Sequence, residues 1–330
     1  MAYRFVTNID GGSKDFTSLV GNLSWSSHID TLGEELSFDF AYNDSKYFES
    51  FNFLREGSIV ARLKDDEVLR HYIIVNTTTS GRFSRSFTCY DYGWYLNKNE
   101  TVIQFKGISV SQAIKKLCDK FGIQHSITDI TTLVTKIYKD RVISDIIKDL
   151  LEQAEQETGT KFFMEMDGDI LKVMRQTDLL IDPTIQLSGN TAPFPVRKFI
   201  SSPSHSTSIE EMKNKIIVVS TGEDSMKVFA EASDEESIAT YGLLTEVVTL
   251  DDEKNAAQAR QIAKNTLNDL SKVKQGSTVT LLGHEDIKAG RLINLDEKIT
   301  GISGKHLIKS ASHTVKKGIH LVSVELEAVE

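Results

Sequence analysis

The side chains best suited to chemistry form two short runs near the C-terminal end of the chain, and neither completes a known motif. His284-Glu285 begins like the His-Glu-x-x-His helix of zinc proteases, but residue 288, where the second histidine would stand, is lysine. The run Gly-Ile-Ser-Gly-Lys at 301–305 resembles a phosphate-binding loop only in its last two residues, and His306 occupies the Ser/Thr position. Nucleophile-elbow and dinucleotide-binding glycine patterns do not occur in the sequence. The motifs therefore predict no active site.

Eight histidines raise a metal hypothesis, above all through His306, His313 and His320. Side chains alternate along a strand, so His306 and His313, seven residues apart, are predicted to point to opposite faces and cannot hold one ion together. We interpret these histidines as strand-surface or interface residues. No metal ligand and no cofactor-binding residue is predicted.

Paired acidic residues are the remaining candidates, because two carboxylates can act as general acid and base. Each pair is interpreted as lying in a turn or at a helix start, where acids are solvated or face the positive end of the helix. The pairs are Glu34-Glu35, Asp65-Asp66, Glu210-Glu211 and Asp251-Asp252. A glycosidase carboxylate pair among the 47 acidic residues stays an open alternative. Our prediction is a protein without enzymatic activity and without catalytic residues.

Composition narrows the class of protein further. Cys89 and Cys118, the two cysteines, show no metal-ligand spacing and are interpreted as reduced packing residues. The 47 acidic and 38 basic side chains give a net charge of −9 without a basic cluster, which disfavours nucleic-acid binding. No run approaches the roughly 20 apolar residues that span a bilayer, and the N-terminus lacks the apolar core of a secretion signal. We expect a protein of several domains, without membrane insertion.

The fold class predicted from the pattern is β-rich α+β. Residues 1–105 are predicted to form a first tube-like β domain, because short alternating apolar runs are separated by Gly, Asn and Asp. The runs are Leu36, Phe38, Phe40; Ile59, Ala61, Leu63; YIIV at 72–75; and FTCYDYGWYL at 87–96.

Residues 106–182 are predicted to form a small inserted α+β module. Ser109 and Gln112 have the spacing of a capping box, and apolar residues then recur at helical intervals, which predicts a helix over 109–121. The same periodicity predicts a second helix over about 142–157, ended by Gly159. Asp167-Gly168 between two apolar runs predicts a tight hairpin with a type I′ turn.

The remaining sequence divides at its prolines. Residues 183–208 contain all four prolines and many Ser, Thr and Asn, so we expect a linker or crossing connection there. Residues 209–330 are predicted to form a second tube-like β domain with a long helix at about 251–270, started by Asp251 and Asp252. Its expected strands cover 215–219, 226–232, 243–250, 277–283, 291–295, 306–313 and 320–329.

A weak internal repeat links the two β regions. Gly57 precedes a strand (SIVARL), a connector, a second strand at 71–75 and the strand SFTCYD. Gly290 precedes RLINL, a connector, a strand at 306–312 and the strand HLVSVELE. Two copies of a strand–connector–hairpin unit predict two β domains of similar fold with the α+β module inserted between them.

The order of these segments resembles a known family. ISDIIKDLLEQAEQETG followed by a hairpin, SIEEMKNKIIVVS at 208–220, the segment 237–270, LLGHEDIKAGRLINL at 281–295 and the segment 301–329 are together similar to the phage late control protein D family. Within that family the chain most resembles the hub proteins of PBSX-type tails. The likeness covers residues from about 50 to 330 and is strongest after 208.

What the resemblance implies is a structural baseplate hub of a contractile phage tail or tail-like bacteriocin. Such a hub is a homotrimer with two tail-tube-like β-barrel domains per chain, and it joins the sixfold tail tube to the threefold central spike. The implied partners are the tail tube or tube-initiator protein, the central spike protein, baseplate wedge proteins and the tape measure protein, with DNA only as passing cargo. The implied location is the virion or tail-like particle, assembled in the bacterial cytoplasm.

Two expectations complete this interpretation. Three copies carry a formal charge of 3 × −9 = −27, so we expect the lining of the channel to be neutral or acidic, which keeps it from binding passing DNA. The alternative function is a cell-wall (peptidoglycan) hydrolase or wall-binding tail protein, with the 106–182 module as its wall-binding part.

Overall fold

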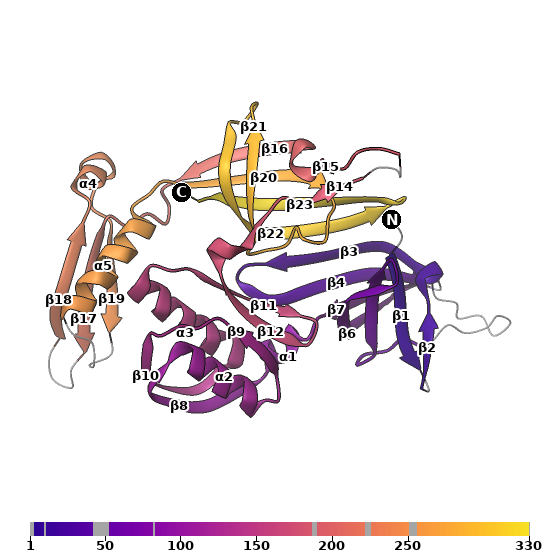
Figure 1. The fold of residues 1–330 in the computed structure, drawn as a ribbon, viewed down its shortest axis with the longest axis horizontal. Helices are drawn as coiled ribbons and strands as arrows, with labels where there is room; N and C mark the ends of the chain where they lie inside the picture. Colours follow the sequence, from indigo (N-terminus) through magenta and orange to yellow (C-terminus); the bar gives the residue numbers. More distant parts are fainter. Residues whose placement is uncertain are drawn as a thin grey trace.

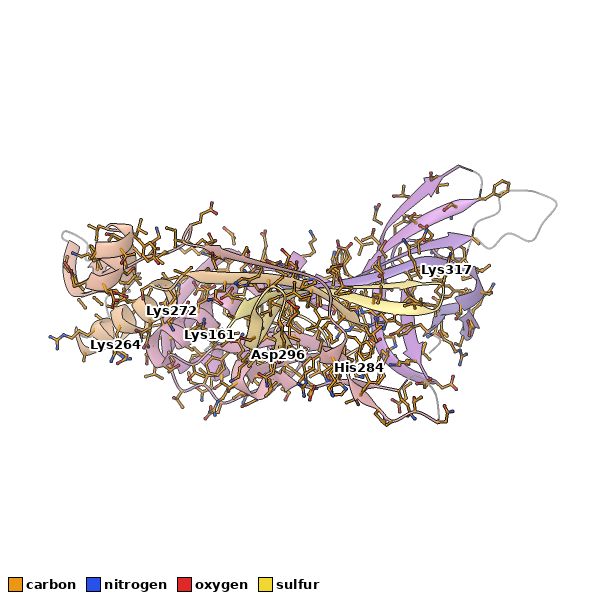
Figure 2. All side chains as sticks on the ribbon, turned by 90° about the horizontal axis from the view of Figure 1, so that it is seen from above. Lys161, Lys264, Lys272, His284, Asp296 and Lys317 are labelled. Carbon is orange, nitrogen blue, oxygen red and sulfur yellow. The ribbon has the colours of Figure 1, made fainter. Side chains whose placement is uncertain are left out.

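A computed structural model describes residues 3–9, 11–41, 53–81, 83–186, 190–221, 226–250 and 256–329. This part of the chain contains 23 strands and five α-helices, so the predicted β-rich α+β class is confirmed. In Figure 1 the C-terminal strands lie above β3 and β4, a helical module lies below, and a smaller helix–sheet unit stands at one end. Seen from above the molecule is elongated, with Lys264 towards one end and Lys317 towards the other (Figure 2).

The N-terminal strands surround an aromatic core. They are β1 Tyr3–Ile9, β2 Gly12–Asp15, β3 Val20–His28, β4 Thr31–Ala41, β5 Ile59–Lys64, β6 Glu67–Ser80 and β7 Ser84–Tyr90, with a 3-10 turn at Thr17–Leu19. The predicted inward face of β4 is confirmed, because Leu36, Phe38 and Phe40 are buried and pack with Phe16 and Phe87.

Two predictions in this region are wrong. Residues 91–96 do not extend a strand, since β7 ends at Tyr90 and helix α1, Gly93–Lys98, follows. In β5 the face turned into the core is Val60 and Arg62. An arginine there contradicts simple alternation of apolar side chains, and its buried partners, described below, provide the reason.

The α+β module contains both predicted helices. Its elements are α1, β8 Glu100–Ser109, α2 Val110–Lys120, β9 Gln124–Ile127, β10 Leu133–Val142, α3 Ile143–Thr158, β11 Phe162–Asp167 and β12 Ile170–Arg175. The capping box at α2 is present, because the Ser109 hydroxyl accepts from the Gln112 N–H and the Gln112 side chain accepts from the Ser109 N–H. Gly159 ends α3 in the left-handed conformation. The β8–β10 pair and β9 were not predicted.

The predicted hairpin is present, with a different turn. Asp167 is the last residue of β11 and pairs with Ile170, so the turn itself is Gly168-Asp169. Gly168 has φ +62° and Asp169 does not adopt a positive φ, which is the pattern of a type II′ turn and not of the predicted type I′. Met164, Met166, Leu171 and Val173 of the hairpin share one core with α2 and α3.

The segment predicted to be a linker contributes a strand to the main sheet. After the 3-10 turn Gln176–Leu179 and the short strand β13 Leu180–Ile181, β14 Thr184–Ile185 pairs with β15 Phe194–Pro195. The 3-10 turn Val196–Lys198 leads to β16, Ser201–Ser208, which pairs antiparallel with β20. The Ser- and Thr-rich composition that suggested a loop therefore belongs to an exposed strand.

A second small unit follows β16. Its strands are β17 Lys215–Thr221, β18 Met226–Ser233 and β19 Thr245–Leu250, with helices α4 Glu235–Tyr241 and α5 Ala256–Leu270. Strands β17 and β19 run parallel, and α5 covers one face of the sheet with Ala259, Ile262 and Ala263. The predicted strands and helix are thus present, but this sheet is separate from the main one. Asp251 and Asp252, the predicted helix start, lie outside the described residues.

The C-terminal strands continue the sheet of the N-terminal region. They are β20 Lys274–Leu282, β21 Leu292–Glu297, β22 Ile302–Lys316 and β23 Ile319–Ala328. Through pairing of β22 with β3, both regions form one 13-stranded sheet with the order β16-β20-β23-β22-β3-β4-β7-β6-β5-β1-β2, and β21 and β13 extend it beside β22. Among the described strands this order is an open path, so the predicted pair of closed barrels is not confirmed.

The predicted internal repeat is present and longer than the sequence indicated. The order β3-β4-β7-β6-β5 in the first region matches β16-β20-β23-β22-β21 in the second. Gly57 and Gly290 occupy equivalent positions, with φ +82° and +81°. The Gly57 N–H donates to the Ile74 carbonyl at 2.8 Å, and the Gly290 N–H donates to the Ile308 carbonyl at 2.8 Å. A register shift follows each isoleucine, before Asn76 in β6 and before Ser310 in β22.

Candidate functional site

The loop between β20 and β21, residues 283–291, connects three parts of the chain and is called the β20–β21 connector. Its Ala289 N–H donates to the Ser27 hydroxyl at 3.0 Å, and its Ile287 carbonyl lies 2.7 Å from His313 Nε2. Lys288 and Arg291 reach the module, where both pair with Glu165 at 3.0 and 2.7 Å. Ile287 and Ala289 are buried. The connector therefore joins the second β region to the first and to the helical module.

An ionic cluster lies where these parts meet, formed by the buried residues Glu34, Arg62, Arg70 and Asp91 and by Glu285, which is partly exposed. The Arg62 guanidinium pairs with Glu34 at 3.1 Å and with Glu285 of the connector at 3.2 Å. Arg70 pairs with Asp91 and donates to the Met166 carbonyl of the module at 2.9 Å. Each charge has an opposite charge beside it, which burial of ions requires.

Hydrogen bonds complete the pairing of the two innermost carboxylates. Asp91 accepts from the backbone N–H groups of Glu34 and Gly93, each at 3.0 Å. Glu34 accepts from the Tyr72 hydroxyl. Burial alone would raise the pKa of the Glu34 carboxyl, but Arg62 and Arg70 outweigh it and hold that pKa below its ordinary value. Glu34 is therefore a charged group held by two arginines.

An aromatic stack covers the cluster on the side of β3 and β22. The Trp25 ring lies 4.8 Å from the His313 ring at an interplanar angle of 7°, and the Arg62 guanidinium lies 4.1 Å from the centre of the Trp25 ring. His313 Nδ1 is 2.9 Å from His320 Nε2, and His320 Nδ1 is 3.1 Å from the Tyr3 hydroxyl. Strands from both β regions thus share one chain of polar contacts.

This arrangement is suited to holding the strands and the module together. The cavity beside Glu34 and Arg70 measures about 30 Å³, which is room for about two water molecules. The two carboxylates face arginines and backbone N–H groups and have no space for a substrate. Within the described ranges, no group of three or more His, Cys, Asp or Glu side chains could hold a metal ion.

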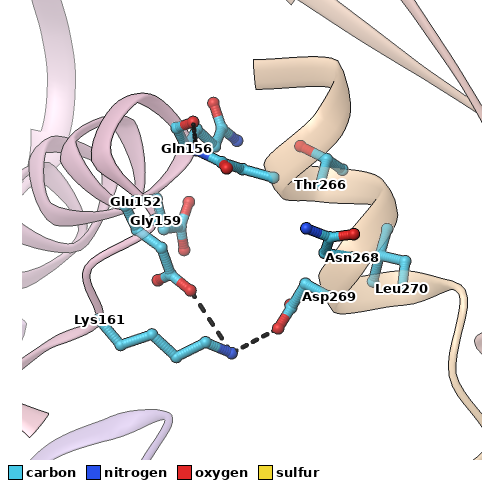
Figure 3. Close-up of a pocket in the computed structure, with 10 residues that line it drawn as sticks. Glu152, Gln156, Gly159, Lys161, Thr266, Asn268, Asp269 and Leu270 are labelled. Atoms are coloured by element: carbon cyan, nitrogen blue, oxygen red, sulfur yellow. Dashed lines mark hydrogen bonds and ion pairs between the residues drawn. The ribbon is translucent and has the colours of Figure 1, made fainter. Parts of the chain in front are cut away.

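A polar groove of about 420 Å³ between α3 and α5 is the second candidate (Figure 3). Lys161 lies between two carboxylates there, 2.6 Å from Asp269 and 3.5 Å from Glu155. The Asn265 side chain donates to the Gln156 carbonyl at 2.9 Å. Lys161 thus links Glu155 of α3 to Asp269 of α5, so the groove is a contact between the module and the smaller unit.

Comparison with known proteins places the chain in a family. A family model described as YQBQ-like matches residues 23–327. The chain belongs to the YQBQ-like family. It is 25% identical over 282 residues to the uncharacterized protein YqbQ of Bacillus subtilis, covering 84% of this chain and 83% of that protein. It is 23% identical over 285 residues to the protein XkdQ of the phage-like element PBSX of the same organism, with the same coverage. The predicted resemblance to PBSX-type tails is thereby confirmed.

Solved structures share the fold of this YQBQ-like chain. The 43 kDa tail protein of prophage MuSo2 from Shewanella oneidensis superposes with a TM-score of 0.69 at 11% identity, covering 98% of both chains. A component of the type VI secretion system of E. coli, described as similar to the T4 tail proteins gp27 and gp5, superposes with a TM-score of 0.54 at 9% identity, covering 94% of this chain and 74% of the other.

The YQBQ-like fold gives His306 and His313 a different arrangement from the predicted one. Both are buried, so the interpretation as strand-surface residues is wrong for them. The register shift between Ile308 and Ser310 also changes the alternation: His306 faces Ala328 and His313 faces Val322, six residues apart, which puts both histidines on one side of the sheet. A separation of about 20 Å along the strand still prevents a shared metal ion.

The other sequence candidates lie in structural positions. Glu285 is an ion-pair partner of Arg62, not part of a zinc helix. The 301–305 run forms the β21–β22 turn and the start of β22. Asp65-Asp66 is a two-residue turn with both φ values positive, and Glu210-Glu211 follows β16 in a turn, as predicted. Glu34 lies inside β4 and is buried, so its assignment to a turn is wrong.

The two cysteines and the helices add no further chemistry. Cys89 and Cys118 are buried free thiols, as predicted. None of the described helices is long and apolar enough to cross a bilayer.

Acid is expected to destabilise the protein through the histidine stack. Burial lowers the pKa of His313 to about 4, and burial and the neighbouring His313 lower that of His320 to about 3. An unfolded histidine takes up its proton near pH 6.5, so between about pH 6.5 and 4 the unfolded chain binds more protons than the folded one. The free energy of unfolding should fall with decreasing pH, by up to about 1.4 kcal/mol per unit for His313.

Urea unfolding of the full chain at pH 7 and pH 5 measures this effect. The His313→Gln variant removes the titrating ring and keeps a polar side chain, so its loss of stability between the two pH values should be smaller than that of the unmodified chain. His28→Gln, at an accessible position on β3, is the control and should keep the original loss. Equal pH dependence in all three proteins would contradict the assignment.

Proposed function

We propose that this protein is the structural hub of a phage-tail or tail-like baseplate, acting as a homotrimer that adapts a sixfold tube to a threefold spike. The observation that carries the proposal is the internal repeat of five strands, β3-β4-β7-β6-β5 and β16-β20-β23-β22-β21. Three chains would present six such units, each serving as one tube-like domain, while keeping threefold symmetry elsewhere. The tail origin of the Shewanella protein and the PBSX origin of XkdQ support a particle of this kind.

The mutual pairing of the buried charged residues agrees with a structural role. The buried acids and bases of the ionic cluster pair with one another and join the β regions to the module, with a cavity of only about 30 Å³ beside them. The partners of the proposed hub are the tail tube or tube initiator, the central spike, wedge proteins and the tape measure protein. Its location is the virion or tail-like particle after assembly in the cytoplasm, and its channel lining is neutral or acidic.

The mass of the full chain in solution tests the proposal. One chain has a mass of 36.9 kDa, so light scattering should give three times that value, about 111 kDa. A monomer over the whole concentration range would overturn the homotrimer. Release of fragments from purified peptidoglycan would instead favour the wall hydrolase, and the hub proposal predicts none.

A further inference from the structure

The two repeats of one chain are joined edge to edge by a defined strand pair. Residues 310–315 of β22 pair antiparallel with residues 23–28 of β3, with Ser310 opposite His28, Ser312 opposite Ser26 and Thr314 opposite Ser24. This joint connects the second repeat to the first and buries Trp25 against His313. The β22–β3 strand pair is therefore an interface through which one repeat binds the next.

The repeat identifies the strands that correspond to each side of this joint. The shared glycine contacts and register shift make Asn76 of β6 equivalent to Ser310 of β22, so residues 76–80 correspond to 310–314. For the other strand of the joint, β3, the equivalence comes from its pairing with β4, which corresponds to the pairing of β16 with β20. Leu36 of β4 is equivalent to Ser277 of β20; Leu36 faces Trp25 of β3, and Ser277 faces His205 of β16. Residues 204–208 of β16 thus correspond to 24–28 of β3.

Among the described strands, both corresponding edges lack a neighbour on one side. In the part of the chain that the structure describes, β5 pairs with β6 only up to Ile73, and residues 76–80 pair with β7 alone. Strand β16 pairs with β20 alone, and seven of its eight residues are exposed. Neither NTTTS at 76–80 nor SHSTS at 204–208 contains a charged residue. Free edges of stable proteins usually carry lysine or another charge that blocks pairing, and these two do not.

We infer that β6 of one copy pairs antiparallel with β16 of a second copy of this chain, repeating between chains the β22–β3 joint found within each chain. The register follows from the equivalence: Asn76 faces Ser208, Thr78 faces Ser206 and Ser80 faces Ser204. This inference rests on the homotrimer proposed above and specifies its interface. The pair joins two different strands, β6 of one copy and β16 of the next, so the contact between copies is head-to-tail. Head-to-tail contacts form a closed ring when the rotation from one copy to the next divides a full turn evenly.

Cysteine cross-linking of the full chain tests the register. Residues directly opposite in an antiparallel pair have Cα atoms roughly 4.5–5.5 Å apart, which a disulfide spans. A chain carrying both Thr78→Cys and Ser206→Cys should form covalent dimers and trimers on mild oxidation, seen on non-reducing gels. The native Cys89 and Cys118 are buried and provide no competing thiol at the surface.

The controls distinguish a failure of the proposed edge pairing from a failure of the proposed homotrimer. Thr78→Cys with Ser204→Cys is two residues out of register and should give at least tenfold less cross-linked product, and each single variant should give no trimer. A mass of about 111 kDa without in-register cross-linking would overturn the edge pairing and leave the homotrimer standing. Cross-linked products that continue beyond three chains would support the edge pairing and overturn the closed trimer. A monomer without cross-linking would overturn both.

Discussion

Replacing Arg62 by methionine is expected to lower the free energy of unfolding by about 3–5 kcal/mol, because it removes the nearer of the two arginines that balance the buried Glu34 carboxylate. Arg62 is 2% exposed and pairs with Glu34 and Glu285, which come from different β regions. Methionine fills a similar volume, so the expected loss comes from the Glu34 charge, which keeps only the more distant Arg70, and from the lost contact with the Trp25 ring. Urea unfolding at pH 7 and fixed protein concentration measures it.

Two further variants identify the cause of that loss. Adding Glu34→Gln to Arg62→Met removes the incompletely balanced charge, and the amide oxygen still accepts from Tyr72, so part of the stability should return. Arg197→Met removes an arginine from an exposed pair with Asp182 and should change stability little. Similar losses for Arg62→Met and Arg197→Met would show that the cluster does not stabilise the fold.

Gly33→Ala is expected to produce the second large loss. Gly33 has φ +100°, and a Cβ atom there would lie 2.3 Å from the Asp91 carboxylate. Asp91 cannot move away freely, because Arg70 and two backbone N–H groups hold it. The methyl group must therefore displace a buried charge from its partners, in addition to the backbone strain of about 1–3 kcal/mol that a left-handed alanine carries.

Gly301→Ala is the matched control for this variant. Gly301 has φ +79°, and no atom lies within 4 Å of the position of its Cβ, so it experiences the backbone strain alone. Gly33→Ala should lose at least about 2 kcal/mol more than Gly301→Ala in the same urea unfolding experiment. Equal losses would mean that Asp91 adjusts without cost and that its position is not fixed by the cluster.

Local sequence signals determined the elements that are stabilised by contacts between residues close together in the chain. The capping box at Ser109, the apolar stripe of α3 with its glycine stop, and the hairpin at Gly168 depend on residues a few positions apart, and each is present. The paired glycines Gly57 and Gly290 indicated the repeat for the same reason, because a positive φ before a strand favours glycine wherever it occurs.

Only the tertiary structure decided which polar residues are buried and how the β regions are connected. The alternation of Ile59, Ala61 and Leu63 implied an outward Arg62, and the acidic pair at 34–35 was assigned to a turn. Arg62 and Glu34 are nevertheless both buried, since each offsets the desolvation of the other although they are 28 residues apart in sequence. The register shift between Ile308 and Ser310 puts His306 and His313 on one side of the sheet, where alternation had predicted opposite faces. The β22–β3 pair, which merges the two regions into one sheet, depends on backbone hydrogen bonds that any sequence can form. Local patterns therefore predicted the repeat itself, while long-range pairing of charges and backbone groups determined how its two copies are joined.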